Sequence, residues 1–589
     1  MREPTIARQQ IDLDRTRQLT RRVSDLLVDM LVQSGVDTVF GLPGGPISTV
    51  HDALLDRDEI RHVTTKHESG AMFAAAGYAR TTGKLGVAIV TSGPGVLNAM
   101  TGLASAHCDG LPVLLLVGEV PKKVHGRGAL QDGSAYGLNI IAMASHISKL
   151  AAELNEPAQA PLMLKRAITT ALSGRRGPVV LTIPMDVALA PLVAPRIASE
   201  ITLQHSIPAQ TLEEIALILE LAQHPLILAG SGCRGAKAPE RLIELAEKLS
   251  CPVATTPKAK GVFPEDHPLA LGVFGLGGHP SARGYVESGV DVVVALGSSL
   301  GDLSTDGWSA ALQAPRAFIQ VDIDARQIGK SYTPTHAVVA TCESFLGGLA
   351  KCAHKVDREA PGGVVRHALA SRDEMIAPHV AIGEIQQVIE KDAIITVDSG
   401  EHFLFATHYL EVTEPDSFLV MTGLGSMGQS IGAAIGAQLA RPDRTCAAIV
   451  GDGCFAMNAF EVATAVSERL PIVVFVFNDQ RLGMVEIGHQ TVYGRKPSYG
   501  TGPIDICQLA EGLGATVVCA ERAGDILAAR ELIQNRIGPV VVEVRIDPDV
   551  RLPKKDRMGA FAPEGEKGKS ENAQVAPPKR LPRGTLPPS

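Results

Sequence analysis

Aromatic side chains are scarce in this sequence. Phenylalanine, tyrosine and tryptophan make up 4% of the chain, with a single tryptophan, whereas hydrophobic residues as a whole make up 45%. The cores must therefore be filled by aliphatic side chains, as in parallel α/β sheets that are buried on both faces. No apolar run reaches the length of a membrane span, and the first residues (MREPTIARQQ) lack the apolar stretch of a signal peptide. We expect a cytoplasmic protein without a membrane partner.

Cysteine motifs and excess positive charge are also missing. The nine cysteines are scattered, form no CxxC pair and are odd in number. We therefore expect neither a disulfide framework nor a zinc site. The net charge of −8 argues against a nucleic-acid partner, because such proteins carry basic surfaces.

The length of 589 residues is too great for one core and predicts several domains. Strand and helix patterns alternate in three stretches, which predicts three α/β domains with doubly wound parallel sheets. The expected domains are residues 20–189, 206–350 and 379–548. Residues 1–19 read as a flexible polar arm, and residues 551–589 as a disordered basic, proline-rich tail.

The stretch from residue 445 to 488 carries the strongest functional pattern. An apolar strand at 445–450 ends in Gly451-Asp452-Gly453, a helix is expected at 459–467, and a second strand at 472–477 ends in Asn478-Asp479. Ligands of open α/β sheets bind at the carboxyl ends of strands, so Asp452 and Asp479 are expected to converge there. Two carboxylates beside glycines are suited to bind an Mg²⁺ ion that bridges the phosphates of a diphosphate. The N–H groups at the start of the following helix would bind the phosphate oxygens. Each motif alone is also typical of an ordinary turn.

Together, the two motifs resemble the thiamine diphosphate motif, in which GDG is followed after one βαβ unit by Asn-Asn or Asn-Asp. The resemblance implies that Asp452 and Asp479 are metal ligands and that the carbonyl of Arg481 is the third ligand supplied by the protein. Many members of this family carry Asn in place of Asp479, so the present site holds one more negative charge. Mg²⁺ tolerates that charge.

A second motif lies near the N-terminus. Residues 66–118 resemble the pyrimidine-binding domain of the acetolactate synthase group, whose catalytic glutamate stands in HExxG; His67 to Ala71 match it. The resemblance implies that Glu68 activates the cofactor by sharing a proton with its pyrimidine ring. Without that context, a glutamate at a helix start is usually a cap or a dipole partner. The turns at residues 41–45 and 92–95 also match loops of the family.

Three further segments match the family with differences. The loop GRGALQDGSAYG resembles one that faces the cofactor from the other subunit, which implies a role for Gln131, although Leu130 replaces the usual Phe and an exposed Gln is often only solvated. Residues 423–428 (GLGSMG) match GLGTMG, which implies that Met427 holds the cofactor bent and that Gly425 offers a carbonyl. His402 is an expected phosphate ligand, whereas Glu401 replaces the usual Gln.

The central segment departs most from the resemblance. Residues 260–282 resemble the middle domain of acetolactate synthases, where FAD lies, but residues 299–303 (SLGDL) replace the usual RFDDR and remove both arginines. FAD binding is therefore doubtful, and a structural FAD or an ADP remains open. Leu303 and Gly488 stand where an arginine and a bulky tryptophan are usual, which predicts a larger or uncharged acceptor. Lys149 matches a lysine near the pocket mouth.

These features predict a thiamine diphosphate- and Mg²⁺-dependent carboligase. It would decarboxylate a 2-oxo acid, with pyruvate as the expected donor, and transfer the acyl carbanion to a carbonyl acceptor in a homodimer or homotetramer with active sites between subunits. A decarboxylase or lyase without ligation and a non-catalytic homologue are the alternatives. The catalytic candidates are Glu68 and Gln131, and the metal candidates are Asp452, Asp479 and Arg481. The cofactor-binding candidates are Gly44, Gly45, Pro94, Asn98, Glu401, His402, Gly425, Met427, Gly451, Asp452, Gly453, Cys454, Asp479, Leu482, Gly483 and Met484. The substrate-pocket candidates are Leu130, Lys149, Val485 and Gly488.

Overall fold

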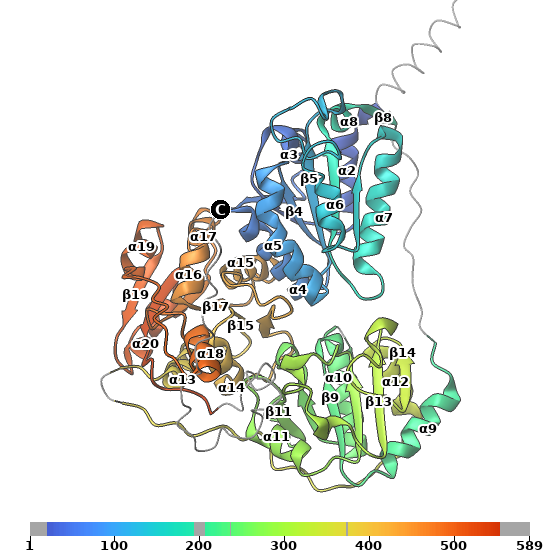
Figure 1. Ribbon diagram of the computed structural model, residues 1–589, viewed down its shortest axis with the longest axis vertical. Helices are drawn as coiled ribbons and strands as arrows, with labels where there is room; N and C mark the ends of the chain where they lie inside the picture. The colour runs from blue at the N-terminus through green and yellow to red at the C-terminus, as the bar shows by residue number, and fades with distance from the viewer. Residues whose placement is uncertain (1–19, 194–205, 236, 373–374, 554–589) are drawn as a thin grey trace, which may run out of the picture.

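The computed structural model describes residues 20–193, 206–235, 237–372 and 375–553. Three layered α/β units are visible, coloured blue to cyan, green, and yellow to orange along the chain (Figure 1). Each contains a six-stranded sheet whose strands are all parallel, so the predicted fold class is confirmed. The domain boundaries given above remain predictions, and the predicted N-terminal arm and C-terminal tail lie almost entirely outside the described residues. Within the described ranges, no helix combines the length and apolarity needed to cross a membrane.

The first sheet has the strand order β3-β2-β4-β5-β7-β6, and a separate antiparallel pair joins β1 to β8. Alternate residues of its strands face two different cores, one beneath α2, α3, α7 and α8 and one beneath α4 and α5. Its elements are β1 (Thr20–Arg22), α2 (Val23–Gln33), β2 (Thr38–Gly41), α3 (Ser48–Leu54), β3 (Arg61–Thr64), α4 (Glu68–Thr82), β4 (Gly86–Val90), α5 (Pro94–Asp109), β5 (Val113–Glu119), α6 (Ile140–Ser145), β6 (Leu150–Glu153), α7 (Ala160–Leu172), β7 (Val179–Pro184), α8 (Met185–Leu189) and β8 (Pro191–Val193).

The second sheet has the order β11-β10-β9-β12-β13-β14. Its larger core lies beneath α9, α10 and α12, and its smaller core beneath α11. The elements are α9 (Ala209–Glu220), β9 (Pro225–Ala229), α10 (Ala238–Leu249), β10 (Val253–Thr255), β11 (Ala270–Val273), α11 (Pro280–Glu287), β12 (Val292–Leu296), β13 (Ala317–Asp322), β14 (His336–Val339) and α12 (Cys342–Cys352).

The third sheet has the order β16-β15-β17-β18-β20-β19, which places β17 and β18 at its centre and leaves β19 at an edge. Its elements are α13 (Pro378–Val388), β15 (Ile394–Val397), α14 (Glu401–Tyr409), β16 (Phe418–Val420), α15 (Ser430–Ala440), β17 (Cys446–Gly451), α16 (Asp452–Asn458), α17 (Glu461–Ser467), β18 (Val473–Asn478), α18 (Gly483–Tyr493), α19 (Ile506–Gly512), β19 (Thr516–Ala520), α20 (Asp525–Ala528), α21 (Arg530–Gln534) and β20 (Val540–Arg545).

Helices α4 and α15 join the first unit to the third. Both are rich in Ala and Gly, and they lie side by side (Figure 1). Their buried residues belong to one core cluster. A Cβ on Gly436 would lie 2.7 Å from the backbone nitrogen of Tyr78, so only glycine permits this approach. The small side chains of α4 and α15 therefore allow close packing between the two domains.

The structure corrects three predictions. The helix expected at residues 459–467 is α17, and a further helix, α16, begins at Asp452 directly after the strand. Strands β6, β11, β14, β16 and β19 were not predicted, because most are short and all five lie at sheet edges, where apolar patterns are weak. Cysteine pairing was also misjudged: Cys507 and Cys519 form a disulfide, which an odd total does not exclude.

Candidate active site

A cavity of about 220 Å³ opens at the carboxyl ends of β15, β17 and β18. This is the sheet edge at which α/β proteins bind ligands. The cavity brings together most of the residues predicted in the third domain. Those lining it are Glu401, His402, Gly425, Met427, Gly451, Asp452, Gly453, Cys454, Asp479, Arg481, Leu482, Gly483, Met484 and Val485.

Two carboxylates define the polar end of this cavity. Asp452, the first residue of α16, is 6% exposed, and burial raises its pKa to about 6. Burial also raises the pKa of Asp479, which directly follows β18, although Arg481 acts in the opposite direction. The negative charge of Asp479 adds to the elevation at Asp452. A divalent cation would relieve this repulsion, so the pair suits a hard metal ion with oxygen ligands.

The side chain of Arg481 pairs with two acids beside the cavity, which the sequence did not predict. Its Nε donates to Asp479 Oδ2 at 3.0 Å, and its Nη1 lies 3.6 Å from Glu486 Oε2. The guanidinium therefore offsets the negative charge that Asp479 adds relative to Asn. Glu401, which replaces the usual Gln, also lies beside an arginine. Its Oε2 is 4.0 Å from Nη1 of Arg551 in an ion pair at the cavity wall.

His402 contributes a buried polar atom that lacks a hydrogen-bond partner. The side chain is buried in the first turn of α14, burial lowers its pKa to about 4, and its Nε2 has no hydrogen-bond partner. Such an orphaned atom at a ligand-sized cavity fits a group that accepts or donates a hydrogen bond there. Gly453 adds to the fit, because a Cβ on it would lie 2.7 Å from Leu482 and 3.2 Å from Met427. The residues present thus fit a diphosphate with its divalent ion.

Asp398 orders the loop that carries Met427. It follows β15, is buried, and accepts hydrogen bonds from the backbone nitrogens of Gly428 and Ser430, both at 3.0 Å. Asn458 Nδ2 donates to the carbonyl of Gly428 at 2.6 Å from the other side. Asp398 was not among the predicted site residues, although its position at a strand end was the available signal.

Residues 499–501 form a short backbone pairing across the metal-binding loop, and we name residues 494–505 the strap. Leu482 N donates to the Tyr499 carbonyl at 2.9 Å, and Thr501 N donates to the Gln480 carbonyl at 3.1 Å. Thr501 Oγ1 donates to Asp452 Oδ2 at 2.5 Å, which lowers the Asp452 pKa against the effect of burial. Thr501 was missed because no motif marks it.

The first domain gathers a second group of predicted residues. Glu68 begins α4, and Asn98 Nδ2 donates to its Oε2 at 3.0 Å. Gly95 and Gln131 adjoin this group, because a Cβ on Gly95 would lie 3.4 Å from Glu68 Oε1 and one on Gly93 would lie 3.0 Å from Gln131. Among the described residues, none of this group lines the cavity of the third domain. In the same domain, Gly44 and Gly45 stand at the start of a short 3-10 helix, and Pro94 is the first residue of α5.

Two glutamates that the sequence analysis missed hold this group in place. Glu461 of α17 is 1% exposed and accepts from the backbone nitrogen of His67 at 2.9 Å, just before Glu68. Glu119, at the end of β5, accepts from Ser92 Oγ at 2.8 Å and from Gly133 N at 3.1 Å. Glu119 thereby joins the turn before α5 to the loop that carries Gln131.

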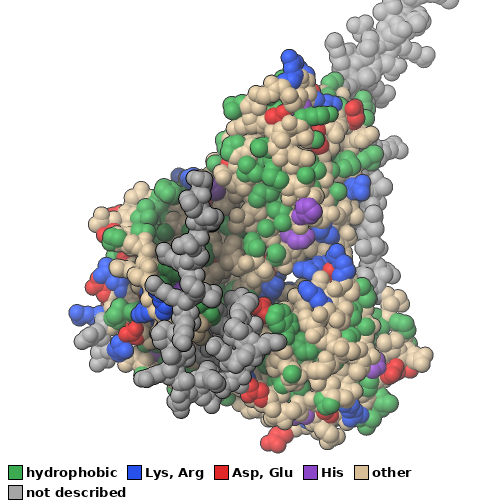
Figure 2. Space-filling view, viewed as in Figure 1, with side chains coloured by type: hydrophobic (Ala, Val, Ile, Leu, Met, Phe, Trp, Pro, Cys, Tyr) green, Lys and Arg blue, Asp and Glu red, His purple; other side chains and the backbone are tan. Residues whose placement is uncertain are grey.

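Lys149 lies outside the third-domain cavity. It lines a separate cavity of about 530 Å³ between the first, second and third domains, where basic side chains gather (Figure 2). Its Nζ donates to the carbonyls of Thr170 and Ser173, and Leu303 lines the same cavity. Leu130 is 85% exposed, and Gly488 lies within α18 but does not line the third-domain cavity. The basic residues lining the large cavity are Lys149, Arg175, Arg176, Lys258, Arg326 and Lys330.

Three parallel sheets, an acid–glycine site at the strand ends of the third and a glutamate at a helix start of the first define a thiamine diphosphate enzyme, and the comparisons agree. The family "Thiamine pyrophosphate enzyme" matches with its N-terminal TPP binding domain at residues 21–138, its central domain at 212–349 and its C-terminal TPP binding domain at 398–544. The chain belongs to this family.

Within the family, the chain is similar to several acetolactate synthases. The probable acetolactate synthase large subunit of Methanocaldococcus jannaschii is 33% identical over 560 residues, which cover 90% of this chain and 93% of the relative. The acetolactate synthase isozyme 2 large subunit of Escherichia coli is 34% identical over 535 residues, covering 88% and 95%. The acetolactate synthase large subunit of Corynebacterium glutamicum is 33% identical over 554 residues, covering 89% and 87%. The protein is therefore an acetolactate synthase-like enzyme of this family.

Proposed function

We propose that the protein is a Mg²⁺-dependent carboligase that decarboxylates a 2-oxo acid, with pyruvate as donor, and joins the resulting acyl group to a carbonyl acceptor. The observation that carries the proposal is the cavity at β17 and β18, where Asp452, Asp479 and the unpartnered Nε2 of His402 face one space. When bound there, thiamine diphosphate supplies the electron sink that decarboxylation of a 2-oxo acid requires.

The side chains around this cavity have separable tasks in the proposal. Asp452 and Asp479 hold the divalent ion, with the Arg481 carbonyl as a third ligand. His402 donates from Nε2 once a nearby phosphate charge has raised its pKa. Met427 is a polarisable apolar wedge beside Gly453, and it limits the conformations available to a bound ring.

Glu68 is the proposed proton carrier. Asn98 fixes the position of Oε2, which leaves the other carboxylate oxygen, Oε1, directed toward Gly95. The side chain is half-buried in the single chain, and a second subunit would cover it further. We propose that Gln131, on the adjoining loop, contacts the substrate.

A second copy of the chain is the proposed partner, in a homodimer or homotetramer. The Glu68 group and the third-domain cavity share no described lining residue, so neither is a complete site alone. Large apolar side chains near the two groups are exposed, which is typical of surfaces that become buried in assemblies. These are Leu97, Leu130, Tyr136, Leu138, Leu424, Met457, Phe460 and Val485.

The acceptor is proposed to differ from that of housekeeping branched-chain synthesis. Leu303 offers no charge to an acceptor carboxylate, and Gly488 leaves space on α18 where a tryptophan is usual in the synthases. Both differences favour a larger or uncharged acceptor.

The large basic cavity supports a second, anionic ligand in the central domain. Ser299 to Ser304, after β12, and Gln327, after β13, place it at the carboxyl ends of that sheet. Its basic residues suit a nucleotide with a diphosphate, either FAD or ADP. A visible absorption spectrum of the purified protein, followed by chromatography of the heat-released nucleotide, distinguishes the two.

Product analysis tests the main proposal. The protein is incubated with pyruvate, Mg²⁺ and thiamine diphosphate, with and without an added aldehyde or second 2-oxo acid. Carboligation predicts a hydroxyketone or acetohydroxy acid that contains carbon from both substrates. Free acetaldehyde as the sole product would replace carboligation with simple decarboxylation, and no pyruvate consumption with any acceptor would favour a non-catalytic homologue.

A further inference from the structure

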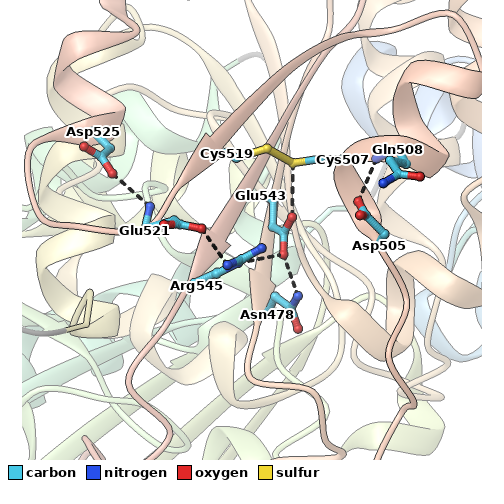
Figure 3. Close-up of a disulfide and its surroundings, with 9 residues drawn as sticks. All are labelled: Asn478, Asp505, Cys507, Gln508, Cys519, Glu521, Asp525, Glu543 and Arg545. Atoms are coloured by element: carbon cyan, nitrogen blue, oxygen red, sulfur yellow. Dashed lines mark hydrogen bonds and ion pairs between the residues drawn. A yellow bond between two sulfur atoms is a disulfide. The ribbon is translucent and has the colours of Figure 1, made fainter.

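The disulfide between Cys507 and Cys519 is the part of the third domain that the proposed reaction does not use. Cys507 lies in the first turn of α19, and Cys519 lies on β19 at the sheet edge (Figure 3). Cys519 is exposed and Cys507 is half-buried, whereas five of the seven free cysteines are buried. The bonded pair is therefore open to attack by a thiolate in solution, which exchange requires.

A buried carboxylate connects this disulfide to the strand that ends at the metal candidates. Glu543 on β20 is 3% exposed, stands opposite Cys519 in the sheet register, and has Oε2 3.1 Å from Cys507 Sγ. Its Oε1 accepts from Asn478 Nδ2 at 2.7 Å (Figure 3). Asn478 directly precedes Asp479. The side chain of Glu543 therefore links the disulfide to the residue next to a candidate metal ligand.

The same disulfide tethers the end of the strap. Asp505, its last residue, caps α19 by accepting from Gln508 N at 2.8 Å, and Cys507 follows two positions later. Only residues 502–504 separate this anchored end from Thr501, whose hydroxyl contacts Asp452. Release of α19 from β19 would thus loosen one anchored end of this short connection, while Thr501 holds the other.

We propose that Cys507 and Cys519 form a thiol–disulfide redox site that controls how firmly the strap is held over Asp452 and Asp479. Its effect on turnover rests on the proposed function, but its chemistry and its effect on the strap do not. In the predicted cytoplasmic setting, disulfides are rare and usually transient or redox-sensing.

The exchange balances with a dithiol as co-reactant. A thiolate of the dithiol attacks the exposed sulfur of Cys519, the bond to Cys507 breaks, and Cys507 leaves as a thiolate that takes up a proton. The second thiol of the reductant then attacks the mixed disulfide and releases the Cys519 thiol. Two electrons pass to the protein pair, and the dithiol becomes a cyclic disulfide. Reoxidation by a small disulfide reverses these steps.

The redox site is tested first by counting thiols. The full-length protein is treated with or without dithiothreitol under native conditions, then denatured, alkylated and weighed by mass spectrometry. We expect seven alkylated cysteines before reduction and nine after it, with the two additional labels on Cys507 and Cys519. Nine labels without reductant, or seven after reduction, would overturn the proposal.

Coupling to the strap is tested by hydrogen exchange of the ligand-free protein. Reduction should accelerate amide exchange in residues 494–505 by at least about fivefold, because a local tether is lost. The double variant Cys507→Ser, Cys519→Ser should exchange fast with or without reductant, and Cys352→Ser, a half-buried free cysteine far along the chain, should behave like the parent. Equal exchange in the reduced and oxidised parent would remove the link to the strap. Neither the thiol count nor the hydrogen exchange depends on turnover. An inactive protein would therefore contradict the proposed function without affecting either test of the redox site.

Discussion

Thr501 donates its hydroxyl hydrogen to Asp452 Oδ2 at 2.5 Å, across 49 positions of the sequence. The bond joins the strap to the first residue of α16 and is the largest influence that lowers the pKa of Asp452, which burial raises to about 6. A loop hydroxyl therefore opposes the effect of burial on the ionisation of a candidate metal ligand.

Thr501→Val should weaken Mg²⁺ binding. The substitution keeps the shape of the side chain and removes the donor, so the Asp452 pKa rises and less carboxylate is available to the metal near neutral pH. We expect the Mg²⁺ concentration for half-maximal activation to increase about tenfold near pH 6, since hydrogen bonds to charged groups contribute on the order of 1.5–3 kcal/mol, and less above about pH 8, where Asp452 is ionised in both proteins. Thr501→Ser keeps the donor and is the control; an unchanged Mg²⁺ requirement in the Val variant would contradict this role.

Glu68→Gln should nearly abolish turnover and leave cofactor binding intact. Glutamine still accepts the hydrogen bond from Asn98 but cannot exchange a proton, so the rate should fall by about 10²- to 10⁴-fold. Product formation measures the loss, and the thermal shift caused by thiamine diphosphate with Mg²⁺ should match that of the parent protein. Asn98→Ala, which removes only the positioning bond, should have a smaller effect; full activity of Glu68→Gln would exclude the proposed proton carrier.

Asp452 and Asp479 could be placed from sequence because they directly follow apolar strands, and strand ends of a parallel sheet meet at one edge. Thr501, Glu119 and the cysteine pair could not. Their contacts depend on the path of loops and on which strand occupies the sheet edge, and neither is encoded in local periodicity. For Lys149 the local match to the family was clear, but the direction of its side chain depends on the fold, which brings its Nζ to the carbonyls that end α7.

Glu119→Ala should destabilise the first domain and disorder the Gln131 loop. Glu119 is 1% exposed, and its loss leaves the Ser92 hydroxyl and the backbone nitrogens of Val120 and Gly133 without their acceptor. We expect about 2–4 kcal/mol of lost stability, because unsatisfied buried donors retain their full desolvation cost. Chemical denaturation measures the loss, and protease cleavage between residues 126 and 139 measures the disorder. Glu119→Gln keeps one acceptor oxygen and should fall between the parent and Ala; an Ala variant as stable as the parent would refute the anchoring role.

Acid should destabilise the contact between the second and third domains through a stack of histidines. His408 contacts His279 and His367, and burial lowers the pKa of His408 to about 4 and that of His279 well below its usual 6.5. Lys260 and Arg366 also disfavour the protonated form of His279, and Arg366 disfavours that of His408. In the unfolded chain both histidines titrate near 6.5, so the unfolded state binds more protons between about pH 6.5 and 4, and stability falls as the pH decreases through this window.

The His408 contribution can be isolated by substitution. His408→Gln removes one titrating group and should reduce the loss of stability on acidification by about 1–2 kcal/mol, although it lowers stability at pH 8 because the bond from His367 N is perturbed. Urea denaturation at several pH values gives both quantities. The exposed His354 provides the control in His354→Gln, whose pH dependence should match the parent. An identical acid dependence in the His408 variant would locate the sensitivity elsewhere.

The buried ion pair beside this stack should be intolerant of losing one partner. Lys260 is 0% exposed, its Nζ contacts Glu265 Oε1, and Arg366 Nη2 donates to Glu265 Oε2 at 2.8 Å. Glu265→Gln leaves a buried ammonium without its counter-ion, for which about 3–5 kcal/mol of destabilisation is typical. Lys260→Met removes the charge together with its desolvation cost, and Glu265 keeps Arg366, so this variant should lose less stability. Denaturant midpoints of the two single variants measure the difference. If Glu265→Gln proved the milder change, the carboxylate would not be balancing the buried charge.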